Sequence, residues 1–436
     1  MTDCNTLTHR FPNCQRRKVE ASFTGGDVSS DGGIQLLRLA DDRLGLLSSV
    51  ASKIEDTRRA ASCVHDTLSL LRQRVYSIAQ GYEDLNDHDD LRTDPAIQTA
   101  VGKDTHLASS PTLCRFENRA TREMGWQVHE VLFDKFVDSF EKPPKELILD
   151  FDATDDLVHG NQEGRFYHGY YDHYCFLPLY VFCQDQLLVS YLRPSKIDGA
   201  KHSGAILRLL VKRLREVWPD VKIIFRGDSG FCRHKILYWC EHNNVDFVIG
   251  LSKNTRLQEM TADIIEQSAE NYRQTQEKQR LFGETHYAAA TWKLQHRVIV
   301  KAEHTNKGAN TRYIVTSLLG DPQAIYERSY CQRGEMENRI KEQQLGLFAD
   351  RTSCHAWWPN QWRLLLSSLA YVLIESIRRL ALIGTELAHA TCGTIRLKLL
   401  KIGAVLLRNT RRVRFLLTSA YPYKTLFFKV CARLTG

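Results

Sequence analysis

Two aspartates stand where predicted β-strands end, and together they could hold a metal ion. Asp152 closes the run 146–152, and Asp228 closes the run 221–228 within the segment Arg-Gly-Asp-Ser-Gly-Phe. Sites in open α/β sheets form at the carboxyl ends of strands. Carboxylates that converge there repel one another unless a cation neutralises them, and Mg²⁺ prefers oxygen ligands. The pair therefore predicts a divalent metal site, which with two ions could act on a phosphodiester.

The first of these two ligands has a rival in Asp150. Residues two apart in a strand point to the same side of the sheet, so Asp150 shares the side of Asp152. We favour Asp152, because it lies nearer the end of the strand and immediately precedes the exit through Ala153 and Thr154.

A later helical segment supplies a third carboxylate. One narrow face of this helix carries four side chains at spacings of three, four and four residues: Tyr330, Arg333, Glu337 and Lys341. An aromatic hydroxyl, two cations and a carboxylate suit a metal ligand flanked by phosphate-binding groups better than they suit an apolar core. The alternative is a solvated helix with an ion pair between Glu337 and Lys341. The two strand-end aspartates favour the metal-binding interpretation.

The elements expected to position these side chains alternate between strands and helices. The hydrophobic pattern predicts strands over 146–152, 171–183, 187–192, 221–228 and 246–251, with helices over 204–218 and 234–242. The order βββαβαβ indicates an α/β sheet of mixed direction. In this topology the first and fourth strands are neighbours, which brings Asp152 and Asp228 together.

The rest of the chain is expected to surround this sheet with helices and further strands. Near the start, Ser30 or Asp31 is predicted to cap a helix over 34–39. Strands are also predicted over 287–292, 296–302, 312–317, 395–399 and 412–415, and a helix over 324–344. The predicted segments are a mainly helical N-terminal region, the first part of the sheet domain, a β-rich insertion, the end of the sheet domain and a basic C-terminal segment, at 1–145, 146–252, 253–322, 323–385 and 386–436.

Positive charge is concentrated at the C-terminal end. The 436 residues carry a formal net charge of +8, and residues 387–436 contain ten Lys or Arg and no Asp or Glu. A near-neutral body with a basic end indicates a polyanionic partner, nucleic acid ahead of a membrane surface. A content of 43% hydrophobic and 25% charged residues excludes a disordered or fibrous chain.

The sequence lacks the features of an exported or membrane protein. The opening residues have no apolar stretch typical of a signal peptide. The most apolar run, 362–382, is interrupted by charges such as Arg363 and Glu375, which favours a buried core helix. The twelve cysteines never form Cys-x-x-Cys and are typical of reduced thiols. We therefore expect a cytoplasmic protein with no membrane association.

Taken together, these motifs resemble the DDE transposases of bacterial insertion sequences, and more specifically the family called DDE transposase group 1. The resemblance rests on Asp152 with Thr154, Asp228 in Arg-Gly-Asp-Ser-Gly-Phe, and Tyr-x-x-Arg-x-x-x-Glu at 330–337. Shorter motifs agree in order and spacing, at 29–33, 118, 169–171, 178–179, 337–341 and 360–361. The resemblance covers about residues 23–430.

The resemblance implies a fold and a catalytic centre. The fold would be RNase H-like, with a β-rich insertion between the second and third acidic residues. Asp152, Asp228 and Glu337 would be the catalytic triad that binds two Mg²⁺ ions, for which Mn²⁺ can substitute. Tyr330 and Arg333 would contact phosphates at the end of the transposon.

Further DNA contacts are expected outside the triad. Related transposases carry a lysine seven residues after the glutamate, where this chain has Gln344. Lys341, one turn earlier on the same face, is the candidate to replace it. In the basic C-terminal segment, we expect Arg411, Arg412 and Arg414 to contact DNA phosphates.

The function implied by the resemblance is that of a transposase of a bacterial insertion sequence. It would bind the terminal inverted repeats and catalyse Mg²⁺-dependent cleavage and strand transfer by cut-and-paste transposition. It would act as a homodimer on double-stranded DNA, both transposon ends and target, with residues 1–145 binding ends or dimerising, at the bacterial nucleoid. Two alternatives stay open: a transposase-derived DNA-binding protein without catalysis, and another RNase H-like nuclease acting on RNA hybrids or DNA junctions.

Overall fold

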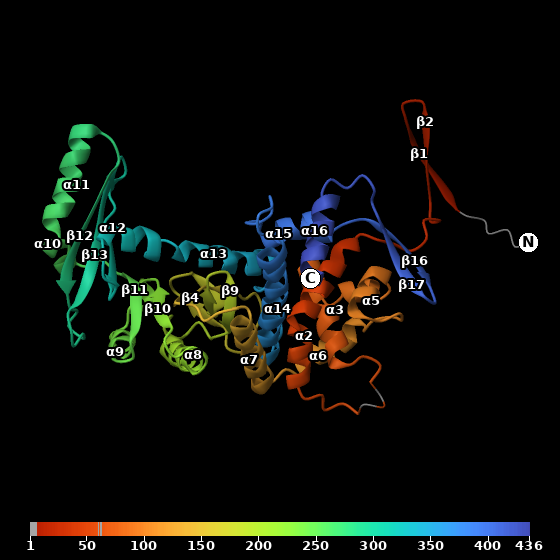
Figure 1. The fold of residues 1–436 in the computed structure, drawn as a ribbon, viewed down its shortest axis with the longest axis horizontal. Helices are drawn as coiled ribbons and strands as arrows, with labels where there is room; N and C mark the ends of the chain where they lie inside the picture. Colours follow the sequence, from red (N-terminus) through yellow and green to blue (C-terminus); the bar gives the residue numbers. More distant parts are fainter. Residues whose placement is uncertain (1–6, 60, 62) are drawn as a thin grey trace, which may run out of the picture. The chain divides into compact units, whose positions relative to one another are not determined.

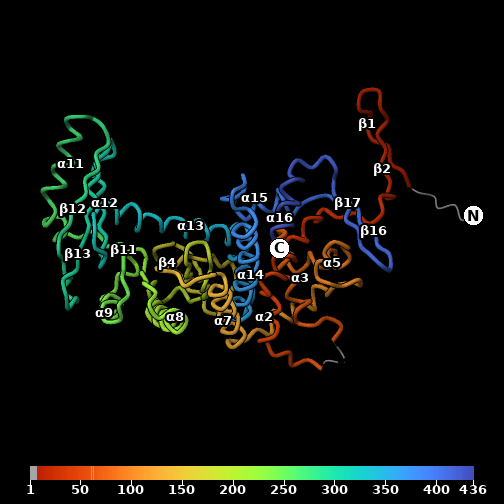
Figure 2. The backbone as a smooth tube through the Cα atoms, viewed as in Figure 1, coloured from red at the N-terminus to blue at the C-terminus, as the bar shows by residue number. Residues whose placement is uncertain are grey.

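The computed structural model describes residues 7–59, 61 and 63–436, and the chain divides into two compact units. Unit 1 comprises residues 1–120, 346–348 and 369–436, and unit 2 comprises residues 121–345 and 349–368. Figures 1 and 2 trace the elements of both units along the chain. Unit 2 contains the sheet on which the two aspartates were predicted.

The central sheet of unit 2 has nine strands among the described residues. They are β4 (Glu146–Ala153), β8 (Leu179–Cys183), β9 (Gln186–Tyr191), β10 (Lys222–Gly227), β11 (Val245–Leu251), β12 (Gln279–Tyr287), β13 (His296–Thr305), β14 (Gly308–Ala309) and β15 (Arg312–Thr316). Their order is β12-β13-β15-β11-β10-β4-β8-β9, with β14 paired to β13.

The half of the sheet that carries the aspartates has an RNase H-like topology. β4 is parallel to β10 and β10 to β11, whereas β8 is antiparallel to β4 and β9 to β8. The chain crosses from β9 to β10 through α8 (Ser203–Val217) and from β10 to β11 through α9 (His234–His242). The predicted order βββαβαβ and the mixed α/β class are confirmed, and the first and fourth strands are neighbours.

Helices cover both faces of this half of the sheet. On one face, α7 (Arg122–Asp138), α8 and α9 pack on side chains that include Leu149, Phe151 and Phe225. On the other face, the helical stretch that begins at residue 322 packs on Ile148 and Ile224. Because side chains alternate along a strand, Asp150 and Asp152 are on the same face as Ile148, beneath this helical stretch.

The predicted helix over 324–344 is a helical stretch of changing pitch. It consists of α12 (Pro322–Ala324), a wide π-helical turn (Ile325–Tyr330), α13 (Arg333–Lys341) and a second wide turn (Glu342–Gly346). Asp321 starts it, because its side chain accepts a hydrogen bond from the Ala324 N–H at 2.7 Å. Wide turns inside helices often occur at functional sites, and the first of these carries Tyr330.

The predicted strand over 171–183 is wrong as a single element. β7 (His173–Phe176) and β8 are separated by Leu177 and Pro178, since proline has no N–H to donate to a sheet. β7 instead joins β5 (Asp156–Leu157) and β6 (Phe166–His168) in a small second sheet.

The inserted segment differs from its prediction in two ways. It begins with two helices that the sequence pattern did not predict, α10 (Thr255–Met260) and α11 (Ala262–Thr275). The predicted strand over 287–292 is also wrong, because β12 ends at Tyr287 and the chain turns, with the ring of Trp292 folded back to 5.6 Å from that of Tyr287. β12, β13 and β15 extend the central sheet beyond β11.

Unit 1 consists mainly of helices with two small β elements. Its helices are α1 (Gln35–Leu44), α2 (Leu46–Lys53), α3 (Thr67–Gln80), α4 (Asp87–Leu91), α5 (Pro95–Val101), α6 (Ser110–Asn118), α15 (Cys392–Ile395) and α16 (Lys424–Thr435). A three-stranded sheet contains β3 (Val28–Ser29), β16 (Ala404–Asn409) and β17 (Arg412–Leu417), and a separate hairpin contains β1 (Thr8–Cys14) and β2 (Arg17–Ser22).

The long helix α14 (Trp357–Ala381) belongs to both units, with residues up to 368 in unit 2 and the rest in unit 1. Many of its side chains are buried, as the sequence predicted for a core helix; Trp362 is one of them. Within the described part of the chain, the structure has no helix with both the length and the apolar character needed to cross a membrane.

The predicted cap at the start of the first helix is wrong. A short 3-10 turn (Gly32–Ile34) precedes α1, and neither Ser30 nor Asp31 caps it with a side-chain hydrogen bond. Asp31 is buried and instead accepts hydrogen bonds from the Tyr82 hydroxyl and the Lys401 ammonium group, both at 2.7 Å. Asp31 therefore ties the start of the chain to the C-terminal segment within unit 1.

Of the two strands predicted in the C-terminal segment, one is wrong and one is confirmed. Residues 395–399 lie in α15 and the wide turn that follows it (Arg396–Leu400), because Thr391 caps α15 by accepting from the Thr394 N–H. The strand predicted at 412–415 lies in β17, which pairs with β16.

Candidate active site

The two strand-end aspartates follow from the register of β4 and β10. These strands are parallel, and their last paired residues are Phe151 and Gly227. Asp152 and Asp228 are the next residues on the two neighbouring strands. Asp228 directly follows β10 and caps a short 3-10 turn, accepting a hydrogen bond from the Gly230 N–H at 2.8 Å. The local fold therefore brings the two carboxylates to one edge of the sheet.

The third carboxylate, Glu337, lies on α13 and is linked to Asp152 by ion pairs with Arg333. The Arg333 Nη1 atom lies 3.4 Å from Oδ2 of Asp152, and its Nη2 atom lies 2.5 Å from Oε1 of Glu337. The side chains of Asp152 and Arg333 are 13% and 19% exposed, and that of Glu337 is 41% exposed. One guanidinium thus joins a buried strand-end aspartate to a helical glutamate that solvent can reach.

The electrostatics of Asp152 reflect the crowding of negative charge. The pKa of Asp152 is raised to about 7, mainly by burial; Arg333 lowers it, and the nearby charges of Asp228 and Glu337 contribute to the increase. Additional positive charge close to Asp152 would favour its ionised form. In their chemistry, the oxygen donors and their surplus negative charge are of the kind that a hard divalent cation prefers.

The three carboxylates do not form a closed metal cage. Among the described residues, no group of three His, Cys, Asp or Glu side chains is arranged so that it could hold an ion. The Arg333 guanidinium lies between Asp152 and Glu337, so a cation that bridged these two would require Arg333 to shift.

Asp150, the rival ligand, has a different partner. Its side chain is buried, and Arg226 donates to both of its oxygens, from Nε to Oδ1 and from Nη2 to Oδ2 at 2.6 Å. Arg226 also donates to the backbone carbonyl of Ser329 in the helical stretch above. Asp150 is thus engaged in a buried ion pair, whereas Asp152 faces Arg333 and the other two carboxylates.

Tyr330 lies beside Asp228. Burial raises the pKa of Tyr330, the Asp228 charge raises it further, and Arg333 lowers it. A β-carbon on Gly250 would lie 2.6 Å from the Tyr330 hydroxyl and 2.8 Å from the Ser229 nitrogen, so the glycine is what permits this close approach. The phenol of Tyr330 is therefore held at the edge of the acidic site.

Lys341 and Gln344, the two positions considered for an additional phosphate contact, lie in different surroundings. Lys341 is exposed, and Glu337 pairs with Arg333, four residues before it. The alternative pair of Glu337 with Lys341 is not formed within the described residues. Gln344, which stands at the position of the expected lysine, donates from Nε2 to the backbone carbonyl of Asp155 at 2.9 Å. Gln344 therefore holds the loop that follows the first aspartate.

Two aromatic side chains beside the site were not predicted. His173 makes a contact of 2.9 Å from Nε2 to the carboxylate of Asp155. Burial and the charges of Asp155 and Asp152 raise the pKa of Tyr171 to about 12. The Gly-Tyr-Tyr segment at 169–171 was the available signal for Tyr171, whereas nothing in the sequence pairs His173 with a residue 18 positions earlier.

The predicted contacts Arg411, Arg412 and Arg414 are in unit 1, at and after the turn between β16 and β17. All three are exposed, and their side chains form no ion pair with any residue that the structure describes. Other cations of the same segment have structural partners: Lys401 pairs with Asp31, and Arg396 donates to the Ala79 carbonyl at 2.7 Å. The basic segment therefore offers part of its charge, and not all of it, to an external polyanion.

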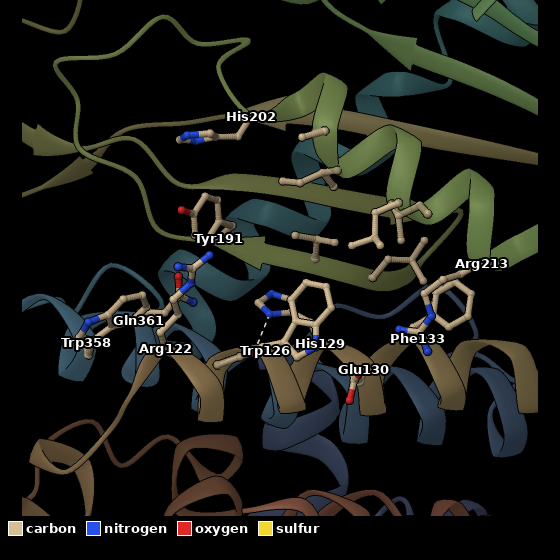
Figure 3. A pocket seen from close by; sticks show the side chains of 17 residues that line it. Arg122, Trp126, His129, Glu130, Phe133, Tyr191, His202, Arg213, Trp358 and Gln361 are labelled. Carbon is tan, nitrogen blue, oxygen red and sulfur yellow. Dashed lines mark hydrogen bonds between the residues drawn. The ribbon is translucent and has the colours of Figure 1, made fainter. Parts of the chain in front are cut away.

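A cavity of about 350 Å³ in unit 2 is separate from the acidic site (Figure 3). It is lined by side chains of α7, α8, β9 and the start of α14, among them Trp126 and Tyr191. The Arg213 guanidinium lies over the Phe133 ring at 4.1 Å from the ring centre. The structure describes Asp152, Asp228 and Glu337, and none of these three carboxylates lines the cavity.

One family model matches this chain, and a solved structure shows a more distant similarity. A family model described as "Transposase DDE domain group 1" matches residues 11–436. Among solved structures, the piggyBac transposase synaptic complex with hairpin DNA is similar, with a TM-score of 0.41 and 11% identity, over 85% of this chain and 78% of that chain. No curated protein matches the sequence significantly. DDE transposases cleave DNA and transfer the cut strand, and generally use divalent metal ions. Since the family model matches nearly the whole length of the chain, this chain belongs to the transposase DDE domain group 1 family.

Proposed function

We propose that this chain is the transposase of a bacterial insertion sequence, which binds the terminal inverted repeats and catalyses Mg²⁺-dependent cleavage and strand transfer. The observation that carries the proposal is the electrostatic coupling of Asp152 to Asp228 and Glu337 at one edge of an RNase H-like sheet. Membership of the transposase family supports the same reaction class.

In this proposal the three carboxylates hold the metal ions. Two bound Mg²⁺ ions, or Mn²⁺ in their place, would supply a nucleophile at neutral pH and stabilise the leaving oxygen. Asp152 and Asp228 are fixed by the ends of paired strands, and Glu337 reaches them from α13. Because the Glu337 side chain is 41% exposed, compared with 13% for Asp152, it can adjust as DNA enters.

The cationic and phenolic groups of the helical stretch position the phosphate. A guanidinium has five N–H donors, more than Arg333 uses on Asp152 and Glu337, so it can also donate to a phosphate oxygen. Tyr330 can donate its hydroxyl from beside Asp228. Lys341 is exposed one turn beyond Glu337 and adds a point charge for the DNA backbone.

The proposed reaction leaves a 3′-hydroxyl at each end of the element. That hydroxyl then attacks a target phosphodiester in line, without a covalent bond to the protein. Because two ends must be handled together, we propose that the chain acts as a homodimer on DNA. The exposed Arg411, Arg412 and Arg414 support contact with the DNA backbone outside the site.

The test is metal-dependent cleavage of end DNA by Asp228→Asn. We expect this variant to lose cleavage of a duplex taken from the DNA that flanks the coding region, in Mg²⁺ and in Mn²⁺, while binding of the same duplex is retained. Asp220→Asn is the matched control, because Asp220 is an exposed aspartate that precedes β10 and is not in the site. Full cleavage by Asp228→Asn would overturn the assignment.

The same assay separates the alternatives. Binding of end DNA by the unmodified protein without cleavage in either metal would identify a DNA-binding protein that has no catalysis. Preferential cleavage of an RNA–DNA hybrid or a branched junction over the end duplex would identify a different RNase H-like nuclease.

A further inference from the structure

The hairpin formed by β1 and β2 is an arm of unit 1. It extends away from the helices of that unit (Figures 1 and 2). Every residue of its two strands is exposed except Val19, which is partly buried. The strands pair antiparallel from Thr8 with Ser22 to Cys14 with Arg17, and a two-residue turn joins them.

This arm has little to hold it in place by itself. Its side-chain contacts include an Arg10–Glu20 ion pair at 2.9 Å across the strands and the rings of His9 and Phe11, whose centres are 4.8 Å apart. An isolated two-stranded hairpin is only marginally stable in water. An extended arm of this kind is stabilised when a partner covers it.

The charge of the arm indicates the chemistry of that partner. Arg16, Arg17 and Lys18 follow one another at the turn, and the only carboxylate between residues 8 and 22 is Glu20, which pairs with Arg10. The side chains of the three turn cations form no ion pair with any residue within the described ranges. Three adjacent exposed cations at the end of an arm are complementary to a run of phosphates.

We propose that the β1–β2 hairpin is a DNA-binding arm, whose turn enters a groove of the duplex and whose Arg16, Arg17 and Lys18 contact phosphates on its walls. A two-stranded β-ribbon fits the major groove of B-DNA, which is about 12 Å wide. This inference rests on the proposed function, because it requires that the chain act on duplex DNA. It adds an N-terminal contact to those expected from α13 and from the C-terminal segment.

A second copy of the chain is a less suitable occupant. Pairing two arms edge to edge with their turns at the same end would bring like charges close together. Pro12 also interrupts the first strand, and the pairing shifts register between Phe11 and Cys14. Prolines and irregular pairing are features that protect the edge of a sheet from pairing with another chain.

The first test measures how DNA binding depends on salt. Each phosphate contact contributes about 0.9 to the slope of log K against log salt, so Arg16→Gln/Arg17→Gln/Lys18→Gln in the full chain should reduce the slope by about 2 to 3. The matched control is Lys142→Gln/Lys145→Gln/Lys212→Gln, which removes three exposed cations from unit 2. A slope equal to that of the unmodified protein in the arm variant would overturn the proposal.

The second test uses Cys14, an exposed free thiol in the last residue of β1. A photoactivatable cross-linker on the thiols should join the protein to a 50-base-pair duplex of flanking DNA, and Cys14→Ser should lose that adduct. An adduct between two protein copies through Cys14, or no Cys14-dependent adduct when binding and cleavage are intact, would overturn the arm alone. Failure of the unmodified protein to bind any duplex would instead overturn the proposed function.

Discussion

Arg333 is the residue through which the acidic site is balanced, because its guanidinium contacts Asp152 and Glu337 at once. Arg333→Gln removes that positive charge and leaves three carboxylates to repel one another. With charge-assisted hydrogen bonds contributing about 1.5–3 kcal/mol, we expect single-turnover cleavage of end DNA to fall by roughly ten- to a hundredfold. Arg328→Gln, an exposed arginine on the same helical stretch, is the control and should cleave normally. Equal rates for the two variants would show that Arg333 has no part in the reaction.

Asp150 and Asp152 are expected to respond to mutation in opposite ways. Asp150→Asn leaves Arg226 buried without a full ionic partner, so we expect the free energy of unfolding to fall by about 3–5 kcal/mol. Asp152→Asn removes a buried carboxylate that two others repel, so we expect a loss of less than about 1 kcal/mol together with loss of cleavage. Urea unfolding of both variants measures the difference. A stable Asp150→Asn protein without cleavage would instead make Asp150 a ligand.

Glu303 in β13 gives a prediction for acid pH. Burial alone would raise its pKa, but hydrogen bonds from Lys278, Lys301 and Asn310 lower it to about 2. Because the folded-state pKa lies below the unfolded value of about 4.3, the ionised form stabilises the fold above that pH, and the contribution is lost as the pH falls toward 2. Glu303→Gln should therefore lower stability by about 1–2 kcal/mol at pH 7 and by progressively less toward pH 2. Thermal unfolding at pH 7, 4 and 3 measures it, and a constant difference would contradict it.

At the scale of elements, Gly33 in the 3-10 turn before α1 has a packing role. A β-carbon on Gly33 would lie 1.9 Å from the backbone carbonyl oxygen of Leu399. Gly33→Ala must therefore move the backbone of one of the two turns, and we expect a loss of about 2–3 kcal/mol in the free energy of unfolding. Gly393→Ala is the control in the same unit, because its β-carbon meets no atom within 4 Å. Similar stability of the two variants in urea would contradict the close approach.

The elements that were predicted correctly are those with a strong local pattern. β4 and β10 are continuous apolar runs, as buried parallel strands are, and α8 shows a regular 3.6-residue period before Pro219. α10 was missed although Asn254 caps it by accepting from the Leu257 N–H. At 395–399 the alternation of apolar and basic residues was misleading, because Arg396 bonds to backbone carbonyls and does not lie on an exposed strand.

The candidate site was predictable where it depends on strand order and helical spacing. Neighbouring strands bring Asp152 and Asp228 to one edge, and a spacing of four residues pairs Arg333 with Glu337. The ion pair of Asp150 with Arg226 was not predictable, because two residues 76 positions apart meet only through the register of β4 and β10.

At the scale of the whole molecule, the formal net charge is +8, and several of the exposed cations lie on β elements of unit 1. The exposed cations at the β16–β17 turn and those of the β1–β2 hairpin are on separate β elements of unit 1. Arg411→Gln/Arg412→Gln/Arg414→Gln should reduce the salt slope of DNA binding by about 2 to 3, independently of the arm variant. Combining both sets should add the two reductions. An unchanged slope in the C-terminal variant would mean that its charge serves something other than DNA.

The central claim is that Asp152, Asp228 and Glu337 hold the same metal ions. Mn²⁺ binding, followed by electron paramagnetic resonance in the presence of end duplex, tests this most directly and does not depend on cleavage. We expect the unmodified protein and Asp220→Asn to bind Mn²⁺ equally, and Asp152→Asn, Asp228→Asn and Glu337→Gln each to weaken binding at least tenfold. If Glu337→Gln bound Mn²⁺ as tightly as the unmodified protein, α13 would not supply a ligand and the three-carboxylate site would be contradicted.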